Sequence, residues 1–248
     1  MSSAAEDLNW IQLEESLKAA VKQLESSSSP NAPPRLTLKA SHAKRHEALE
    51  SLQQLRSQIE QHPALFELRG VPATELGLFL KTPALWADHH LKTLERRSEW
   101  VAGRLAVFDC LHDAPKSSDR PNFYSSVSHS NGAILACGGF TSAPLGIDVE
   151  SSSRKISAAA KARVFSEQEQ KLGLNSIELW TIKEASFKAL QLPSPSTLSD
   201  IVVETAHTIP FGKTGTAGLT RTRGQTCSFW TYHHWDWTLS LAQMNLRV

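Results

Sequence analysis

The stretch Gly146-Ile147-Asp148-Val149-Glu150 alternates as a β-strand does. Successive side chains of a strand point to opposite faces, so Ile147 and Val149 share an apolar face and Asp148 and Glu150 share an acidic one. Two carboxylates about 7 Å apart along a strand repel each other unless a cation lies between them, and a hard ion such as Mg²⁺ prefers oxygen ligands. A solvated edge strand would carry the same pattern, so both interpretations stay open for this stretch alone.

Short β-compatible runs lie on both sides of this strand, separated by turn residues. The dipeptide Asn131-Gly132 is typical of a tight hairpin, because both residues tolerate the positive φ of a type I′ turn. The pattern predicts sequential strands. The runs are residues 123–128, 133–137, 145–149, 201–205, 227–233 and 237–242, with a glycine-rich piece at 212–218.

Helices are expected between the two groups of strands. Residues 158–164 are alanine-rich, and Ser166 and Glu169 have the spacing of a capping box, which assigns Glu169 to helix capping. A longer helix is expected over 177–190, ended by Pro193. Because the helices are grouped and do not alternate regularly with strands, the pattern predicts an α+β fold with mostly antiparallel strands.

The first 70 residues are expected to form a helical extension. Apolar residues recur at helical spacing over 13–24 and 49–59, with Ser and Pro residues interrupting the pattern between them. Packing on the main domain and a role in partner docking or self-association both stay open for this extension. A further helix is expected from about Asp88, with one apolar face and one basic face. The basic residues are Lys92, Arg96, Arg97 and Arg104.

The composition excludes several classes of protein. With 248 residues, 40% of them hydrophobic, the chain can bury a core and is not disordered throughout. A formal net charge of +1 gives no general attraction for nucleic acid. Three cysteines without CxxC spacing indicate a reducing compartment. Without an export signal or a membrane-spanning apolar run, we expect a cytoplasmic monomer with no nucleic-acid or membrane partner.

The second chemical motif is the segment WTIKEASFK at residues 180–188. Trp180, Glu184 and Lys188 recur every four residues and therefore share one helical stripe. Alone, Glu184 and Lys188 would most often form an exposed ion pair worth roughly a few tenths of a kcal/mol. Beside the acidic strand, Glu184 would supply a third carboxylate for Mg²⁺ and the Lys188 ammonium could hold a phosphate. That combination suits phosphoryl-type transfer.

The segment Ser126-Val127-Ser128-His129-Ser130 ends a predicted strand, and its hydroxyls and imidazole could donate to an anion. A hydrolase built on Ser128 and His129 is disfavoured, because neighbours on a strand point to opposite faces and no G-x-S-x-G elbow is present.

Taken in order, these segments resemble the 4′-phosphopantetheinyl transferases, and more narrowly their longer, pseudo-dimeric branch. The resemblance covers residues 76–245, and the ordered pair GIDVE and WTIKEASFKA is its most specific part. The remaining segments are RRSEWVAGR, SVSHS and FSEQE. The resemblance implies a transferase domain over 76–248, built from two pseudo-symmetric α/β halves at about 76–150 and 151–248.

The resemblance also implies the reaction and its residues. The 4′-phosphopantetheine arm of coenzyme A would pass to a serine of an apo acyl or peptidyl carrier protein of fatty-acid, polyketide or nonribosomal-peptide synthesis, releasing adenosine 3′,5′-bisphosphate. Glu184 and Lys188 would be catalytic, with Glu184 as the base. The implied Mg²⁺ ligands are Asp148, Glu150 and Glu184. The implied coenzyme A contacts are Ser128, His129, Lys188, Arg96, Arg97 and Arg104.

Two alternatives remain. A non-catalytic protein of the same fold could bind coenzyme A or a carrier without turnover, although three intact acids favour an enzyme. A metal nuclease would share the D-x-E with a later Glu and Lys, but the near-zero net charge and the lack of basic stripes interleaved with aromatic residues argue against it.

Overall fold

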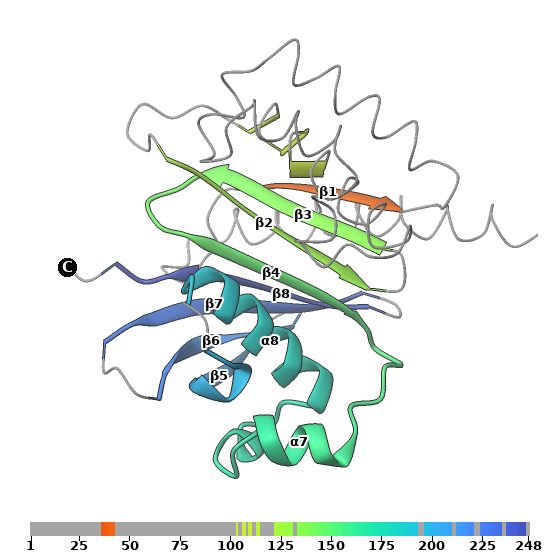
Figure 1. Cartoon of the computed structure of the whole chain (residues 1–248), viewed down its shortest axis with the longest axis vertical. Helices are drawn as coiled ribbons and strands as arrows, with labels where there is room; N and C mark the ends of the chain where they lie inside the picture. Colours follow the sequence, from red (N-terminus) through yellow and green to blue (C-terminus); the bar gives the residue numbers. More distant parts are fainter. Residues whose placement is uncertain are drawn as a thin grey trace, which may run out of the picture.

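The computed structural model describes two β-sheets, the helices that accompany them and part of one further helix (Figure 1). Predictions for all other residues, including most of the 1–70 extension, lie outside this part of the chain. The described residues are 36–42, 122–130, 133–192, 196–209, 212–220, 224–234 and 237–246, with single positions at 103, 106–107, 109–110 and 113–114.

The described strands pair in antiparallel fashion in both sheets, which confirms the predicted α+β class. The three-stranded sheet has the order β1-β3-β2, with β1 at Thr37–His42, β2 at Phe123–Ser130 and β3 at Ala133–Phe140. The five-stranded sheet has the order β4-β8-β7-β6-β5. Its strands are β4 at Leu145–Ser151, β5 at Ile201–Ile209, β6 at Gly212–Leu219, β7 at Thr226–His234 and β8 at Trp237–Met244.

The hairpin predicted at Asn131-Gly132 is confirmed. Strands β2 and β3 pair up to Ser130 opposite Ala133, so two residues make the connection. At the open end of the hairpin Phe123 lies opposite Phe140, and their rings meet edge to face at 5.4 Å between centroids. Such an aromatic pair adds to the stability of the ladder beyond its buried area.

Two complete α-helices and two 3₁₀ helices belong to the described residues. They are α7 at Ala158–Val164, η1 at Glu169–Lys171, α8 at Ser176–Ala189 and η2 at Leu198–Asp200. The predicted spans 158–164 and 177–190 are confirmed to within one residue. Helix α8 begins after Asn175, whose side-chain oxygen accepts hydrogen bonds from the N–H groups of Ile177 and Glu178.

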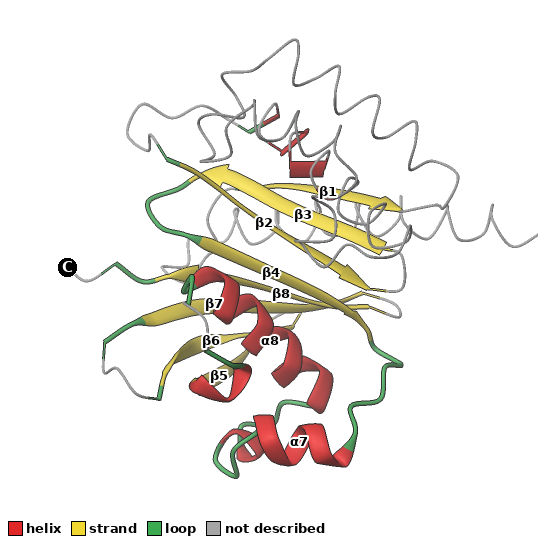
Figure 2. Cartoon of the chain, in the orientation of Figure 1, coloured by secondary structure: helices red, strands yellow, loops and turns green. Residues whose placement is uncertain are grey.

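The five-stranded sheet is covered on both faces. Helix α8 crosses one face (Figure 2), where Leu179, Ile182 and Ala185 pack with Phe229 of β7. The three-stranded sheet supplies side chains to the other face. That cluster contains Leu38, Leu135, Cys137, Leu145, Ile147, Val149, Trp230, Tyr232, Leu239 and Leu241. Because both faces are occupied, every residue of β4 is buried.

Two strands depart from the sequence predictions. Thr37–His42 forms β1 and pairs with β3, so the predicted helical extension is wrong for these six residues. The glycine-rich piece at 212–218 forms β6 between β5 and β7. A Cβ at Gly215 would lie 2.0 Å from the carbonyl oxygen of Thr205, so glycine is required for this close pairing of strands.

The described positions between 103 and 113 are helical, as predicted, and their buried side chains include Ala106, Val107 and Cys110. The predicted boundary near residue 150 falls inside β4, and β4 joins the sheet of the second proposed half. The two pseudo-symmetric halves stay a prediction. No helix among the described residues has the length and apolarity to cross a membrane.

A buried ion pair and its hydrogen bonds join α8 to α7, η1 and β5. The Lys183 ammonium lies 2.8 Å from the Glu169 carboxylate, and both side chains are almost fully buried. Lys183 also donates to the carbonyl oxygens of Val164 and Ile201. Glu169 accepts from the N–H of Ser166, which confirms its predicted capping role, and from the N–H of Val203. Burial lowers the pKa of Lys183, although Glu169 opposes this shift.

We expect Lys183→Met to lower the free energy of unfolding by about 3–5 kcal/mol, because it leaves the Glu169 carboxylate buried without its cation. Urea denaturation checks this value. The matched control is Lys171→Met at an exposed lysine of η1, which should change stability by less than about 0.5 kcal/mol. A loss of under 1 kcal/mol in Lys183→Met would contradict the assigned role.

A second charged contact lies at the start of α8. Glu178 is buried, its carboxylate accepts from the N–H of Asn175, and it lies 2.8 Å from Nε2 of His233 on β7. Burial by itself would raise the pKa of Glu178, but the hydrogen bonds from His233 and Asn175 prevail, and the pKa is lowered.

A carboxyl group whose pKa is lowered in the folded protein stabilises the fold at pH values above its ordinary pKa of 4.5. This stabilisation is lost as the pH falls through the pKa of the folded state. We expect Glu178→Gln to cost about 1 kcal/mol at pH 7, with this cost shrinking below about pH 4.5. Thermal unfolding from pH 3 to 7 checks it, with Glu167→Gln as an exposed control. A cost that does not vary with pH would contradict the assignment.

Candidate active site

The acidic strand β4 lies at the edge of its sheet, where its outward N–H groups need partners outside the ladder. Strand β2 provides them with alternate serine hydroxyls. The N–H of Ile147 donates to Oγ of Ser126 at 3.0 Å, and the N–H of Val149 donates to Oγ of Ser128 at 3.1 Å. The two sheets are thus joined at their edges through serine side chains. The alternative of a solvated edge strand is therefore wrong.

The same serines hold the two carboxylates. The Ser128 hydroxyl donates to Oδ1 of Asp148 at 2.7 Å, and the Ser130 hydroxyl donates to Oε2 of Glu150 at 2.7 Å. All four side chains are buried. Because both hydroxyls approach from β2, they fix one oxygen of each carboxylate.

The stripe of α8 predicted from the sequence faces this strand. Lys188 donates to the carbonyl oxygen of Ile147 at 2.8 Å and to Oδ1 of Asp148 at 3.0 Å. Trp180, two turns earlier, lies under the guanidinium of Arg154 at 5.4 Å from the ring centroid. Lys188 therefore pairs with Asp148, and the simpler prediction of an exposed Glu184–Lys188 ion pair misses this contact.

Glu184 lies between Trp180 and Lys188 on the stripe, and the charge of Asp148 on β4 affects its pKa. Burial and the negative charge of Asp148 raise its pKa, while Lys188 and Arg154 act in the opposite direction. Burial likewise raises the pKa of Asp148 against the charge of Lys188 and the hydrogen bond from Ser128. Two carboxylates with raised pKa values thus face each other, an arrangement that favours an added cation.

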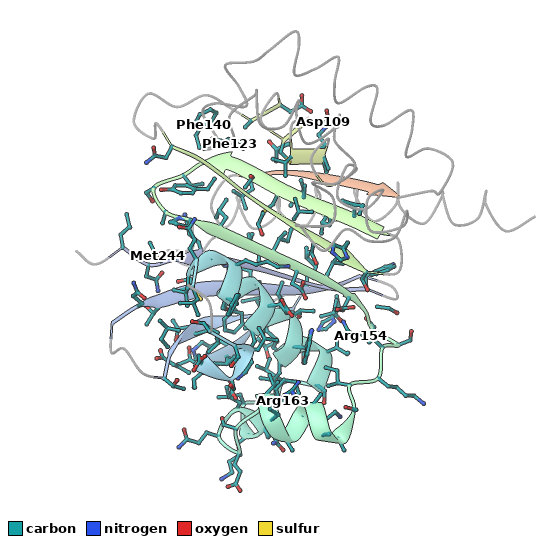
Figure 3. All side chains as sticks on the ribbon, viewed as in Figure 1. Asp109, Phe123, Phe140, Arg154, Arg163 and Met244 are labelled. Atoms are coloured by element: carbon teal, nitrogen blue, oxygen red, sulfur yellow. The ribbon has the colours of Figure 1, made fainter. Side chains whose placement is uncertain are left out.

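Arg154 lies in the turn after β4, beside the end of α8 that carries Trp180 (Figure 3). Its guanidinium forms an ion pair with Oε1 of Glu150. Its positive charge opposes the rise that burial causes in the pKa values of Asp148 and Glu184. All three acids are therefore within the influence of this arginine.

The fit of a divalent cation depends on the oxygens that are still available. Oδ2 of Asp148 is buried and accepts no hydrogen bond from any residue that the structure describes. This atom and the Glu184 carboxylate are hard oxygen donors of the kind that Mg²⁺ takes. Within the described ranges, no three His, Cys, Asp or Glu side chains form a group able to hold a metal ion. Glu150 is instead occupied by Ser130 and Arg154.

The remaining predicted coenzyme A contacts are His129 and three arginines. His129 alternates with Ser128 and Ser130 along β2 and is exposed, so it lies on the opposite side of the strand from the serine contacts. The three arginines predicted to hold the nucleotide lie outside the described residues. They are Arg96, Arg97 and Arg104.

Sequence reasoning named the hydroxyls of Ser126 and Ser130 only as possible donors to an anion, and it did not name Arg154. The serines carried a detectable signal, since they repeat every second residue on a strand as Asp148 and Glu150 do. No sequence signal indicated Arg154, because its position depends on the turn in which its N–H donates to the carbonyl oxygen of Ser151.

The family model described as 4′-phosphopantetheinyl transferase superfamily (ACPS) matches residues 144–244. This segment is therefore similar to that superfamily. No curated protein matches the chain. The matched segment contains β4 and α8, and so it holds Asp148, Glu150, Glu184 and Lys188.

The superfamily match supports phosphopantetheine transfer in general. The contacts from β2 lie before the matched segment. The two carboxylates of the matched segment, Asp148 and Glu150, therefore accept hydrogen bonds from Ser128 and Ser130 of the neighbouring sheet.

Gly146 sets the distance between β4 and α8 in this domain. A Cβ at this position would lie 1.9 Å from the carbonyl oxygen of Ala185 and 2.6 Å from the nitrogen of Ala189, both backbone atoms of α8. The backbones of β4 and α8 thus lie close together, and Lys188 of α8 contacts Ile147 and Asp148 of β4.

We expect Gly146→Ala to lower the free energy of unfolding by about 2–3 kcal/mol and to reduce transferase activity, because the added methyl pushes α8 away from β4. Urea denaturation and a transfer assay measure the two effects. The control is Gly218→Ala in β6, where the nearest atom is the flexible Glu204 carboxylate. Equal effects of both substitutions would refute this account.

Proposed function

We propose that this protein transfers the 4′-phosphopantetheine arm of coenzyme A to a serine of an apo acyl or peptidyl carrier protein, releasing adenosine 3′,5′-bisphosphate. The observation that carries the proposal is the placement of Glu184 and Lys188 of α8 against Asp148 of β4, inside the segment that matches the superfamily. We further propose the longer branch of the superfamily, a monomer and a cytoplasmic setting. The three buried thiols, Cys110, Cys137 and Cys227, are compatible with that setting.

Mg²⁺ is part of the proposal, held by Asp148 and Glu184 with Glu150 as the third carboxylate. When bound, the ion would offset the negative charge of the coenzyme A diphosphate. Oδ2 of Asp148, which has no hydrogen-bond partner among the described residues, supports this assignment.

The other proposed roles in the reaction belong to Lys188 and Glu184. The Lys188 ammonium, held by Asp148 and the carbonyl oxygen of Ile147, is placed to donate to a phosphate oxygen and to stabilise charge on the transferring group. Glu184 is the proposed general base. It takes the hydroxyl proton as the carrier serine attacks the phosphorus that bears the pantetheine arm, and the bond from this phosphorus to the bridging oxygen breaks.

The proposal also names the residues that would bind the nucleotide. Exposed His129 on β2 is proposed to meet a coenzyme A phosphate, together with Ser128 and with Arg96, Arg97 and Arg104 of the predicted basic helix. The burial of Ser128 and its two hydrogen bonds favour a positioning role for this residue, since it orients Asp148.

We expect Glu184→Gln and Asp148→Asn each to reduce transfer at least about 100-fold with the fold retained, because each removes a charge from the centre. Intact-mass analysis of apo carriers incubated with coenzyme A and Mg²⁺ measures transfer. The matched control is Glu204→Gln, an exposed carboxylate on β5 at the opposite edge of the sheet.

An unchanged carrier mass across several acyl and peptidyl carriers would count against the proposal. If coenzyme A still binds under those conditions, a non-catalytic binding protein of the same fold becomes the better account. Retained transfer in either site variant would refute the residue roles.

A further inference from the structure

Two cations lie on the acidic face of β4, and their surroundings differ. Lys188 is held by Asp148 and by the backbone of β4, and its side chain is 29% exposed. Arg154 is 43% exposed and pairs with Glu150 from a turn. Arg154 is therefore the cation with the easier path into solvent.

Arg154 also contacts Trp180. The guanidinium lies 5.4 Å from the centroid of the indole ring, close enough for a cation–π interaction. Since Trp180 is on α8 and Glu150 is on β4, Arg154 bridges the two elements that carry the acids. A guanidinium supported by the ring can leave the carboxylate without losing all of its contacts.

The charge of Arg154 also acts on acids that it does not contact directly. It lowers the pKa values of Asp148 and Glu184, whose burial raises them. Arg154 thus opposes the effect of burial on Asp148 and Glu184 while it occupies Oε1 of Glu150. An added cation would have to compete with Arg154 for this oxygen.

We propose that Arg154 is an internal counter-ion that occupies Glu150 until a divalent cation displaces it, with Trp180 as the platform that retains the displaced guanidinium. This inference rests on the proposed function, which makes Glu150 a ligand of the ion. Arg154 is a positioning residue in this scheme: it sets the affinity of the acidic centre for divalent cations through Glu150.

The first test is a calorimetric titration of the metal-free full chain with Mg²⁺ and, separately, Mn²⁺. We expect Arg154→Gln to bind either ion about two- to five-fold more tightly than the wild type, because the competitor for Glu150 is gone and a half-exposed ion pair is weak. Arg154→Lys, which retains the charge, should lie between the two. Lys155→Gln is the matched control, since it removes the same charge from the next, exposed residue and should change affinity by less than about 1.5-fold.

The second test compares thermal unfolding in EDTA with unfolding in saturating Mg²⁺. We expect Arg154→Gln to lower Tm by about 1–3 °C in EDTA, where the acids lose their counter-ion, and to match the wild type once the ion is bound. A merely structural arginine would lower Tm equally under both conditions.

Unchanged or weaker metal binding in Arg154→Gln, or a Tm loss that Mg²⁺ does not remove, would overturn this inference. If metal binding and carrier transfer are intact while Arg154→Gln behaves as Lys155→Gln does, the inference fails and the proposed function stands. If the wild type binds neither ion and modifies no carrier, both fail together.

Discussion

A buried strand edge is the constraint on which the rest of this structure depends. Strand β4 ends its sheet, yet it lies between β2 and α8, so its outward backbone groups must be paired inside the protein. Ser126 and Ser128 accept from its N–H groups, and Lys188 donates to its carbonyl oxygen at Ile147. Because Ser128 and Lys188 also bind Asp148, the contacts that complete the fold are the ones that orient the carboxylate.

The charged residues of the segment WTIKEASFK lie in two different environments. Lys183 points into the core and pairs with Glu169, so it stabilises the loops that carry α8. Glu184 and Lys188 lie on the side of β4 and meet Asp148. Lys183 and Lys188, five residues apart on α8, thus lie in the core and beside the acidic strand respectively. The difference arises from helical periodicity, which sends neighbouring side chains to different faces.

The acidic centre is balanced by cations of the chain itself. Lys188 offsets Asp148, and Arg154 offsets Glu150 while it rests on Trp180. Oδ2 of Asp148 remains buried with no hydrogen-bond partner among the described residues, which marks the point where further positive charge is most favourable. The proposed transfer and the proposed exchange at Arg154 both draw on this distribution, in which Arg154 is more exposed than Lys188.

The sequence by itself determined the local elements and the order of the motifs. The period of two in GIDVE and the period of four through Trp180, Glu184 and Lys188 correctly assigned each residue to a face, because such periods follow from backbone geometry alone. Only the tertiary structure decided that β1 and β6 are strands, since their pairing depends on distant chain segments. It also decided that Ser130 and Arg154 hold Glu150, because local periodicity does not show which strand edge or turn approaches a given side chain.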